Sequence, residues 1–372
     1  MDDNNLKYEV DFLPVGEGEK SGDAITFRFS RDNGRSWVIG VIDGGTKDSG
    51  TALCEHIKTH YGNPSQINMV LLTHPDGDHA SGLTEVLNSF DVKLLVMHQP
   101  WNHVSEIFDK ISDDRVTQDS MVKRLQEELP FAYELEKLAL SKRIPITEPF
   151  SDGFISTSPF NILSPSKTFY LDQLLGFRSV APITEEQKSI GFVATLAKAA
   201  TEAIKWIIET WNSESLAEPD ENATSCENNS SVVLLINVGK LLLFTGDAGV
   251  PALSEASNRA KLLGINLPSC AFVQIPHHGS KRNVSPAVLN EIIGGIQPEG
   301  ASARFTAFIS ASKDGEPKHP SKRVVNAFKR RGAGITVTKG LAICHKNNMP
   351  TRAGWGDAPL LPFYDRVEDD TD

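Results

Sequence analysis

A short apolar run that ends in a cluster of histidines and aspartates is the feature that most constrains this chain. The run Met69–Leu72 predicts a buried strand, and the loop after it carries His74, Asp76, Asp78 and His79. In a turn that follows a strand, residues two apart can point the same way, so the four side chains can serve two neighbouring divalent cations. The alternative is a solvated polar turn with a helix N-cap, and the density of ligand-type side chains disfavours it.

Small residues in and after this cluster predict a rigid loop. Gly77 lies between the two pairs of ligands, where it allows a tight turn. The stretch Ser81-Gly82-Leu83 is typical of a helix start, and a helix packed under the loop would hold the ligand side chains in place.

Two further polar turns follow apolar strands in the second half of the chain. Residues 231–244 predict a hairpin that ends in a Thr-Gly-Asp turn, which can project both oxygens of Asp247 between two cations. Residues 271–275 predict a buried strand that ends in His277 and His278. Neighbours on an extended chain point oppositely, so one histidine is expected to bind metal and the other to lie behind it or to face the substrate.

These stretches together resemble the metallo-β-lactamase superfamily. Residues 73–79 are similar to its H-x-[HD]-x-D-H signature, in the H-P-D-x-D-H form of the hydrolase domain of ComEC-type DNA-uptake proteins. Residues 228–235, 243–248 and 276–280 resemble its N-x-S-x-V strand, T-G-D turn and H-H-G-S loop. The resemblance implies an α+β fold, an αβ/βα sandwich in which two mixed sheets pack face to face with helices outside and metals at one edge.

The resemblance also implies cofactors and chemistry. Two divalent ions, zinc or manganese, are expected to activate a water molecule for attack, and Asp78 is counted as catalytic as well as a ligand. Asp76 stands where β-lactamases carry histidine, which makes manganese as plausible as zinc. The expected metal ligands are His74, Asp76, Asp78, His79, Asp247, and His277 or His278.

Four further residues are assigned by resemblance. Asp43 follows a predicted strand at the position where the superfamily carries an acidic residue that hydrogen-bonds the metal loop, although an Asp-Gly turn is an equal reading of the local sequence. Asp23 matches the end of a G-x-G-D-A turn and is either structural or part of the site. His98 follows the next predicted strand and can supply an extra ligand to the first metal ion. His103 is a second candidate for this role and is ranked below His98. The simpler interpretation is that both are polar loop residues.

Substrate contacts are expected from two later loops. His319 lies in a Lys-His-Pro stretch that resembles the family's G-H-P, so it is a candidate to contact substrate or to protonate the leaving group. Lys318 departs from the family pattern at the glycine position. Lys281, Arg282 and Lys318, with Lys313 nearby, are candidates to receive an anionic group such as phosphate, although ordinary surface charge would explain them too.

The middle of the chain has a different pattern. Residues 117–141 are charged and leucine-rich, and residues 189–211 place apolar side chains at helical spacing, so both predict helices. Residues 154–163 predict a strand that rejoins the core. We therefore divide the chain into two halves of a hydrolase core, residues 1–103 and 226–345, a mainly helical insertion, residues 104–225, and a tail, residues 346–372. The insertion is expected to pack on the core, to cover the site, or to bind a second copy or another protein.

Composition and charge narrow the classes of molecule that the chain can bind and the compartment in which it is expected. The formal net charge of −11 argues against a broad surface for duplex DNA, so a nucleotide or a single-stranded nucleic acid fits better. The first residues lack a basic and apolar leader, and no stretch is apolar enough to span a membrane. Four scattered cysteines without a Cys-x-x-Cys pair fit reduced thiols. We therefore expect a cytoplasmic protein.

The function that these features favour is metal-dependent hydrolysis of a phosphodiester by a nuclease or phosphodiesterase. Hydrolysis of an acyl or lactone bond on the same metal centre is the competing enzymatic reading. The third reading is a non-catalytic protein of this fold that binds a partner, which the intact set of ligands disfavours.

Overall fold

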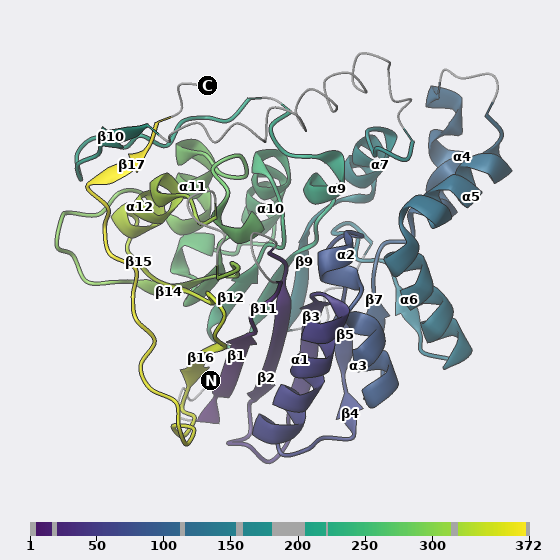
Figure 1. Ribbon diagram of the computed structural model, residues 1–372, viewed down its shortest axis with the longest axis horizontal. Coiled ribbons are helices and arrows are strands. Elements are labelled where there is room, and N and C mark those ends of the chain that lie inside the picture. The colour runs from purple at the N-terminus through teal and green to yellow at the C-terminus, as the bar shows by residue number, and fades with distance from the viewer. Residues whose placement is uncertain are drawn as a thin grey trace.

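Two β-sheets packed face to face form the centre of the molecule in a computed structural model, and helices cover their outer faces (Figure 1). The structure describes residues 5–16, 21–111, 116–153, 159–180, 205–220, 222–313 and 319–369. The expected αβ/βα sandwich is therefore confirmed.

The first sheet has the strand order β16-β1-β2-β3-β5-β7-β8, and it is antiparallel from β16 to β3 and parallel from β3 to β8. Its strands are β1 (Lys7–Phe12), β2 (Ala24–Ser30), β3 (Val38–Gly44), β5 (Met69–Leu71), β7 (Leu95–Val96), β8 (Ile146–Thr147) and β16 (Ile343–Asn347). A separate two-stranded sheet pairs β4 (Gln66–Ile67) with β6 (Asp91–Val92).

The second sheet has the order β15-β14-β13-β12-β11-β9, and its strands from β12 to β15 are parallel. They are β9 (Phe160–Ser164), β11 (Val233–Asn237), β12 (Leu241–Phe244), β13 (Phe272–Gln274), β14 (Phe305–Ile309) and β15 (Ala333–Val337). Because the carboxyl ends of parallel strands lie at one edge of a sheet, the loops after β12, β13 and β14 come together there.

The first sheet is covered by helices from the first half of the chain and the second sheet by later ones. They are α1 (Lys47–His60), α2 (Gly77–Ala80), α3 (Leu83–Ser89), α4 (Val104–Ile107), α5 (Gln118–Glu128), α6 (Pro130–Ser141), α7 (Lys167–Leu175), α9 (Cys226–Asn229), α10 (Val250–Leu262), α11 (Pro286–Ile293) and α12 (Lys322–Arg330). Of these, α1 begins at an N-cap, Thr46, whose side chain accepts a hydrogen bond from the Ser49 N–H.

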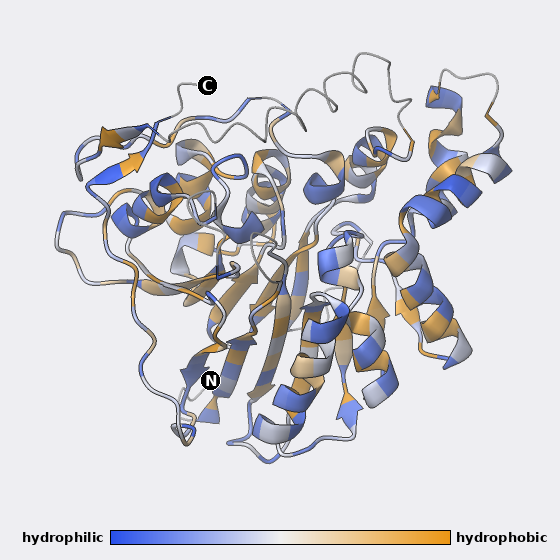
Figure 2. Ribbon diagram, in the orientation of Figure 1, coloured by the Kyte–Doolittle hydropathy of each residue, from blue (hydrophilic) through white to orange (hydrophobic). Residues whose placement is uncertain are grey.

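Three apolar layers hold the sandwich together. One lies under the helices of the first sheet, one under the helices of the second, and the third lies between the sheets. Aromatic rings fill this central layer, with Phe12, Phe272 and Phe308 in edge-to-face pairs. Figure 2 shows the strands as the most continuous apolar part of the ribbon, as expected for strands buried on both faces.

Glycines let the helices of the first half pack directly against the backbone beneath the metal loop. A Cβ on Gly82 would lie 2.0 Å from the Gly44 carbonyl oxygen, and a Cβ on Gly50 would lie 2.2 Å from the Gly82 oxygen. Only residues without side chains allow this approach. The Ser81-Gly82-Leu83 stretch thus packs under the ligands, as its sequence predicts.

Residues 104–225 supply α4 to α7 and also strands to both sheets. The strand expected over residues 154–163 is confirmed in its described part, because β9 pairs with β11 in the second sheet. The helix expected over residues 189–211 lies largely in 181–204, outside the described residues. Its end is wrong: Trp206–Ile208 forms β10, which pairs with β17 (Arg366–Glu368) of the tail. In the described parts of the chain, no helix has the length and apolarity to cross a membrane.

Candidate metal centre

The metal loop, residues 73–79, follows β5 and runs into α2. Asp76 is the N-cap residue of α2, so Asp78 and His79 lie in its first turn. His74 and His79 are buried, whereas Asp76 and Asp78 are partly exposed. Gly77 does not have a positive φ, and a Cβ there would lie 2.7 Å from the ring of Phe131, which packs on this glycine.

Asp43 fixes this loop from below. Its Oδ1 accepts a hydrogen bond from the Thr73 N–H at 2.8 Å, and its Oδ2 accepts from the Thr73 hydroxyl at 2.6 Å and lies 2.8 Å from His79 Nδ1. Asp43 is fully buried and has a positive φ of 55°. The carboxylate therefore contacts the loop in the way that the resemblance implies, by orienting a ligand rather than by facing the open side of the site.

Asp247 lies at the centre of four imidazoles. Its Oδ2 is 3.6 Å from Nε2 of both His79 and His277, and 3.9 Å from Nε2 of both His74 and His278. Gly246 makes the turn that projects this carboxylate, with a φ of 50° and close contact with Thr73.

His277 and His278 do not point oppositely. Both have positive φ, 46° and 56°, in a short 3₁₀ turn (His277–Gly279), so the extended-chain expectation is wrong. Their Nδ1 atoms lie 2.7 Å from Asn283 Oδ1 and 2.8 Å from the Ser310 carbonyl oxygen. Both rings therefore direct Nε2 toward Asp247, and both are placed to bind metal.

The tautomers of the imidazoles follow from their partners. The Thr73 hydroxyl donates to Asp43 and so accepts from His74 Nδ1 at 3.1 Å, while His79 Nδ1 donates to Asp43. The Nδ1 atoms of His277 and His278 likewise face oxygen acceptors. All four Nε2 atoms are consequently directed at one carboxylate, and in the neutral imidazoles their lone pairs would be free to bind cations there.

Unpaired buried atoms point to the same conclusion. Within the described residues, Nε2 of His74, Nε2 of His79 and Oδ1 of Asp247 are buried and make no hydrogen bond. Buried polar atoms are normally paired, so these three call for a ligand that accepts lone pairs. The residues present therefore fit divalent metal ions.

The two partly exposed aspartates border the same space. Asp76 Oδ2 lies 3.9 Å from His74 Nε2. Asp78 can offer an oxygen within 4.8 Å of ligand atoms from His79 and His278. The structure thus brings together all seven candidate ligand residues, including both of the histidines that the sequence offers as alternatives.

Asp23 is part of this centre too, although its role was open. It is buried, its Oδ2 accepts a hydrogen bond from Gln274 Nε2 at 2.7 Å, and it groups with Asp43 and His79. Gln274 Oε1 also accepts from the N–H groups of Thr245 and Gly246 at 2.9 and 3.2 Å. Gln274, which sequence patterns did not single out, therefore ties Asp23 to the turn that carries Asp247.

Burial and crowding of charge perturb these groups strongly. Burial raises the pKa of Asp23 to about 8, the carboxylates of Asp247 and Asp43 add to the shift, and His79 opposes it. Burial lowers the pKa of His278 to about 3. Burial would raise the pKa of Asp247, but the imidazoles around it, His277 first, hold that pKa well below its usual range. The centre favours a neutral imidazole at His278, the protonation state that binds metal.

His98 does not join the metal centre. It is absent from the groups of ligand atoms found in the described residues, and its ring stacks on Tyr170 with centroids 4.2 Å apart. Burial lowers its pKa well below the usual value, and His103 adds to this. His103 itself pairs with Glu148 and Glu106 at 2.9 and 2.7 Å. The structure thus gives the extra-ligand reading no support for His98 or His103, and that reading stays a prediction; aromatic packing directs the His98 ring into the core.

The remaining predicted residues divide among three places. The His319 ring lies 5.9 Å from that of His277 and 6.3 Å from that of His278, so it borders the metal centre. Lys318 lies outside the described residues, and Lys281 is partly exposed on the loop that follows the histidines.

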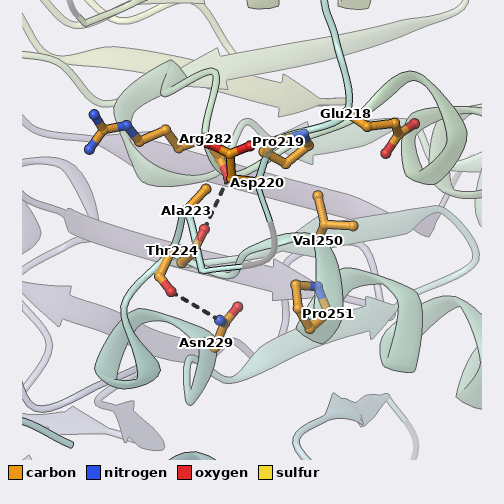
Figure 3. Close-up of a pocket in the computed structure, with 9 residues that line it drawn as sticks. All are labelled: Glu218, Pro219, Asp220, Ala223, Thr224, Asn229, Val250, Pro251 and Arg282. Atoms are coloured by element: carbon orange, nitrogen blue, oxygen red, sulfur yellow. Dashed lines mark hydrogen bonds between the residues drawn. The ribbon is translucent and has the colours of Figure 1, made fainter. Parts of the chain in front are cut away.

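Arg282 belongs to a neighbouring pocket. Its carbonyl oxygen accepts a hydrogen bond from the Thr224 hydroxyl at 3.0 Å. Figure 3 shows this pocket, which is lined by Glu218, Pro219, Asp220, Ala223, Thr224, Asn229, Val250, Pro251 and Arg282. Two acidic residues in that lining offset the charge of Arg282, so the pocket is not a simple anion receptor.

Residues 31–137, from just before β3 into α6, match the model of the Metallo-beta-lactamase superfamily. Residues 31–137 are therefore similar to a domain of this superfamily, while the finer ComEC-type resemblance stays a prediction. No curated protein matches the chain.

Three solved structures are similar to this chain at low identity. Zn²⁺-bound PqqB from Methylobacterium extorquens is 11% identical over 90% of this chain and 99% of its own, with a TM-score of 0.39. The hydrolase AbOPH of the beta-lactamase superfamily is 10% identical over 65% of this chain and 71% of its own, with a TM-score of 0.33. A metallo-beta-lactamase-type protein from Thermotoga maritima is 12% identical over 69% of this chain and 92% of its own, with a TM-score of 0.32.

Proposed function

We propose that this chain is a hydrolase in which Asp247 and the histidines and aspartates around it would hold two divalent cations, zinc or manganese. The observation that carries this proposal is the convergence of four imidazole Nε2 atoms on Asp247 Oδ2, at 3.6 to 3.9 Å. A single carboxylate between two cations screens their repulsion, which is the role that its central position supports. Ligand atoms of His74, His79 and Asp247 group together, as do those of Asp78, His79 and His278, and Asp76 lies 3.9 Å from His74 Nε2.

When bound, two such cations would supply a lowered pKa for a water molecule and stabilisation of charge on the departing oxygen. The chain's own residues hold the ligands in position. Asp43 fixes the orientation of His79, Ser310 that of His278, and Asn283 that of His277. His319 borders the ligands beside His277, where it is placed to give a proton to a leaving group.

We infer a phosphodiester in a nucleotide or a nucleic acid as the substrate. Support comes from the H-P-D-x-D-H form of the metal loop and from the carboxylates of Asp76 and Asp78, which suit the hard cations that phosphoryl chemistry uses. An acyl or lactone bond is the alternative on the same centre.

The test is hydrolysis by metal-stripped protein that is refilled with Zn²⁺ or Mn²⁺. A chromogenic phosphodiester and a chromogenic lactone are compared in wild type and in Asp247→Asn, with Asp109→Asn on the exposed surface as the matched control. We expect turnover of the phosphodiester in wild type and the control, and a loss of two or more orders of magnitude in Asp247→Asn. Turnover of the lactone alone would move the assignment to that class, and a folded, metal-loaded but inert wild type would favour a partner-binding role.

A further inference from the structure

Arg178 is not one of the candidate metal ligands, but its side chain is held at the rim of the metal centre. The backbone N–H and the Nε of Arg178 both donate to Glu227 Oε1, at 2.8 and 3.1 Å. The Glu227 side chain is 3% exposed and lies in α9, so it is a rigid anchor. Nη2 of Arg178 lies 3.8 Å from Asp76 Oδ1. The guanidinium is therefore held beside the metal loop although its side chain is 74% exposed.

Most donors of this guanidinium are available to a ligand. In the described part of the chain, Nε is the guanidinium nitrogen that makes a hydrogen bond, and Nη2 is beyond hydrogen-bond distance from Asp76. The Nη1 and Nη2 groups keep four N–H donors in the planar geometry that matches a phosphate. Asp76 is a ligand in the proposed site, so bound cations draw its charge away from Arg178.

An exposed aromatic ring packs on Gly77, the residue that follows Asp76 in the metal loop. Phe131, in the first turn of α6, is 49% exposed. A Cβ on Gly77 would lie 2.7 and 2.8 Å from Cδ2 and Cε2 of this ring. Phe131 thus packs on Gly77, directly after Asp76 in the chain, and leaves about half of its surface to solvent. Exposed phenylalanines next to ligand clusters provide flat surfaces for planar groups.

We propose that Arg178 and Phe131 form a nucleotide subsite at the rim of the metal centre. The Nη groups of Arg178 bind a phosphate oxygen, and the base stacks on Phe131. This inference rests on the proposed function and names its substrate class as a nucleotide unit, free or at the end of a single strand. Stacking on a ring tolerates every base, so the subsite selects nucleotides without selecting sequence.

Calorimetry on the zinc-loaded full chain separates the two contacts. The probes are adenosine 5′-monophosphate, ribose 5-phosphate and adenosine. We expect Arg178→Ala to weaken binding of the two phosphates about tenfold to a hundredfold and to leave adenosine unchanged. We expect Phe131→Ala to weaken binding of the two adenosine compounds by about fivefold or more and to leave ribose 5-phosphate unchanged.

Two variants serve as controls. Phe131→Leu keeps an apolar side chain on Gly77 but removes the ring, so it should behave as Phe131→Ala if stacking is the contact. Lys123→Ala removes an exposed charge from α5 and should change no affinity. Zinc content is measured for every variant, because Arg178 also neighbours Asp76.

The subsite is wrong if wild type binds no adenosine 5′-monophosphate, or if Arg178→Ala and Phe131→Ala bind it as wild type does. It is also wrong if Arg178→Ala loses zinc while the loaded fraction keeps its nucleotide affinity, because Arg178 would then only position Asp76. Chromogenic phosphodiester hydrolysis is measured in parallel. Nucleotide binding that depends on both residues without hydrolysis would overturn the proposed function and leave the subsite standing.

Discussion

Asp43 shows how one buried side chain controls several ligands. It holds the backbone and the hydroxyl of Thr73 and the ring of His79. The hydroxyl of Thr73 in turn contacts His74 Nδ1, so two imidazoles of the proposed metal site depend on one carboxylate. Such outer contacts set the orientation and basicity of ligands.

The first expectation concerns this carboxylate. Asp43→Asn cannot accept all three hydrogen bonds, so we expect zinc affinity to fall about tenfold to a hundredfold. Competition with a chromogenic chelator measures the affinity, and Thr73→Ser, which keeps the hydroxyl, serves as the control. Unchanged zinc affinity in Asp43→Asn would show that the loop holds its shape without this carboxylate.

Sequence patterns identify ligands better than the residues that hold them. His74, Asp76, Asp78, His79, Asp247 and the two adjacent histidines all belong to recognisable motifs, and the structure brings them together. Gln274, Asn283 and Arg178 belong to no motif, because each acts through a partner that only the fold brings near. The position of His98 after a strand does not reveal that its ring packs on Tyr170 and Phe150.

A second expectation concerns pH and stability. His345 hydrogen-bonds with the Tyr8 hydroxyl at 3.0 Å, and burial lowers the pKa of His345 to about 4. An unfolded histidine titrates near about 6.5. Since the folded pKa is lower, the folded state disfavours the proton, and the contribution of His345 is complete above about pH 6.5 and is lost as pH falls toward 4.

Urea unfolding at several pH values measures this loss. In wild type His345 should remove up to about 3 kcal/mol of the free energy of unfolding between pH 7 and pH 4, whereas His345→Gln should lack that part of the pH dependence. An identical slope in both proteins would mean that His345 is solvated or already charged in the folded state.

At the scale of elements, the packing of α1 and α3 against β3 supports the metal loop. Gly44, Gly50 and Gly82 meet with no room for a side chain, and the loop with α2 lies between these elements in the chain. The contacts that a Cβ on Gly82 would make are with backbone oxygens, which cannot rotate away. The position of the ligands therefore depends on this crossing.

We expect Gly82→Ala to lower both the free energy of unfolding, by about 1–3 kcal/mol, and zinc affinity, because α3 must shift. Gly153→Ala is the matched control, since no atom lies within 4 Å of a Cβ placed there. Thermal unfolding and chelator competition measure the two effects. Equal behaviour of the two variants would mean that the helices can separate without disturbing the loop.

Elements with local signals were predicted well, and elements defined by distant partners were not. The strand expected over Met69–Leu72 is β5, the hairpin expected over residues 231–244 is the pair β11 and β12, and the strand expected over residues 271–275 is β13. The end of the expected helix over 189–211 is strand β10, although Trp206, Ile207 and Ile208 are residues that favour strands. Its partner, Arg366–Glu368, lies too far along the chain for periodicity to reveal the pairing.

At the scale of the whole molecule, the C-terminal segment closes the first sheet. Arg352 binds Asp11 through Nη1 and Nη2, at 2.6 and 2.9 Å, and also pairs with Glu9. Both carboxylates are buried in β1, where Tyr61 adds a hydrogen bond to Asp11. Burial would raise the pKa of Asp11, but His56 and Arg352 hold it well below its usual range. The tail thus stabilises the first strand through charge.

Arg352→Ala would leave two buried carboxylates without this partner. We expect it to lower the free energy of unfolding by about 3–5 kcal/mol, the range for breaking a buried pair from one side. Urea unfolding measures the change, with Arg35→Ala on the exposed surface as the control. A loss under about 1 kcal/mol would show that water or Arg28 replaces the guanidinium.

The central claim is that Asp247 bridges two cations. A crystal structure of the zinc-loaded protein with anomalous scattering at the zinc edge tests it most directly. We expect two peaks about 3.5–4 Å apart, one on each side of the Asp247 carboxylate and both within bonding distance of the histidine Nε2 atoms. A single peak, or zinc bound away from Asp247 while the four imidazoles keep their positions, would contradict the account.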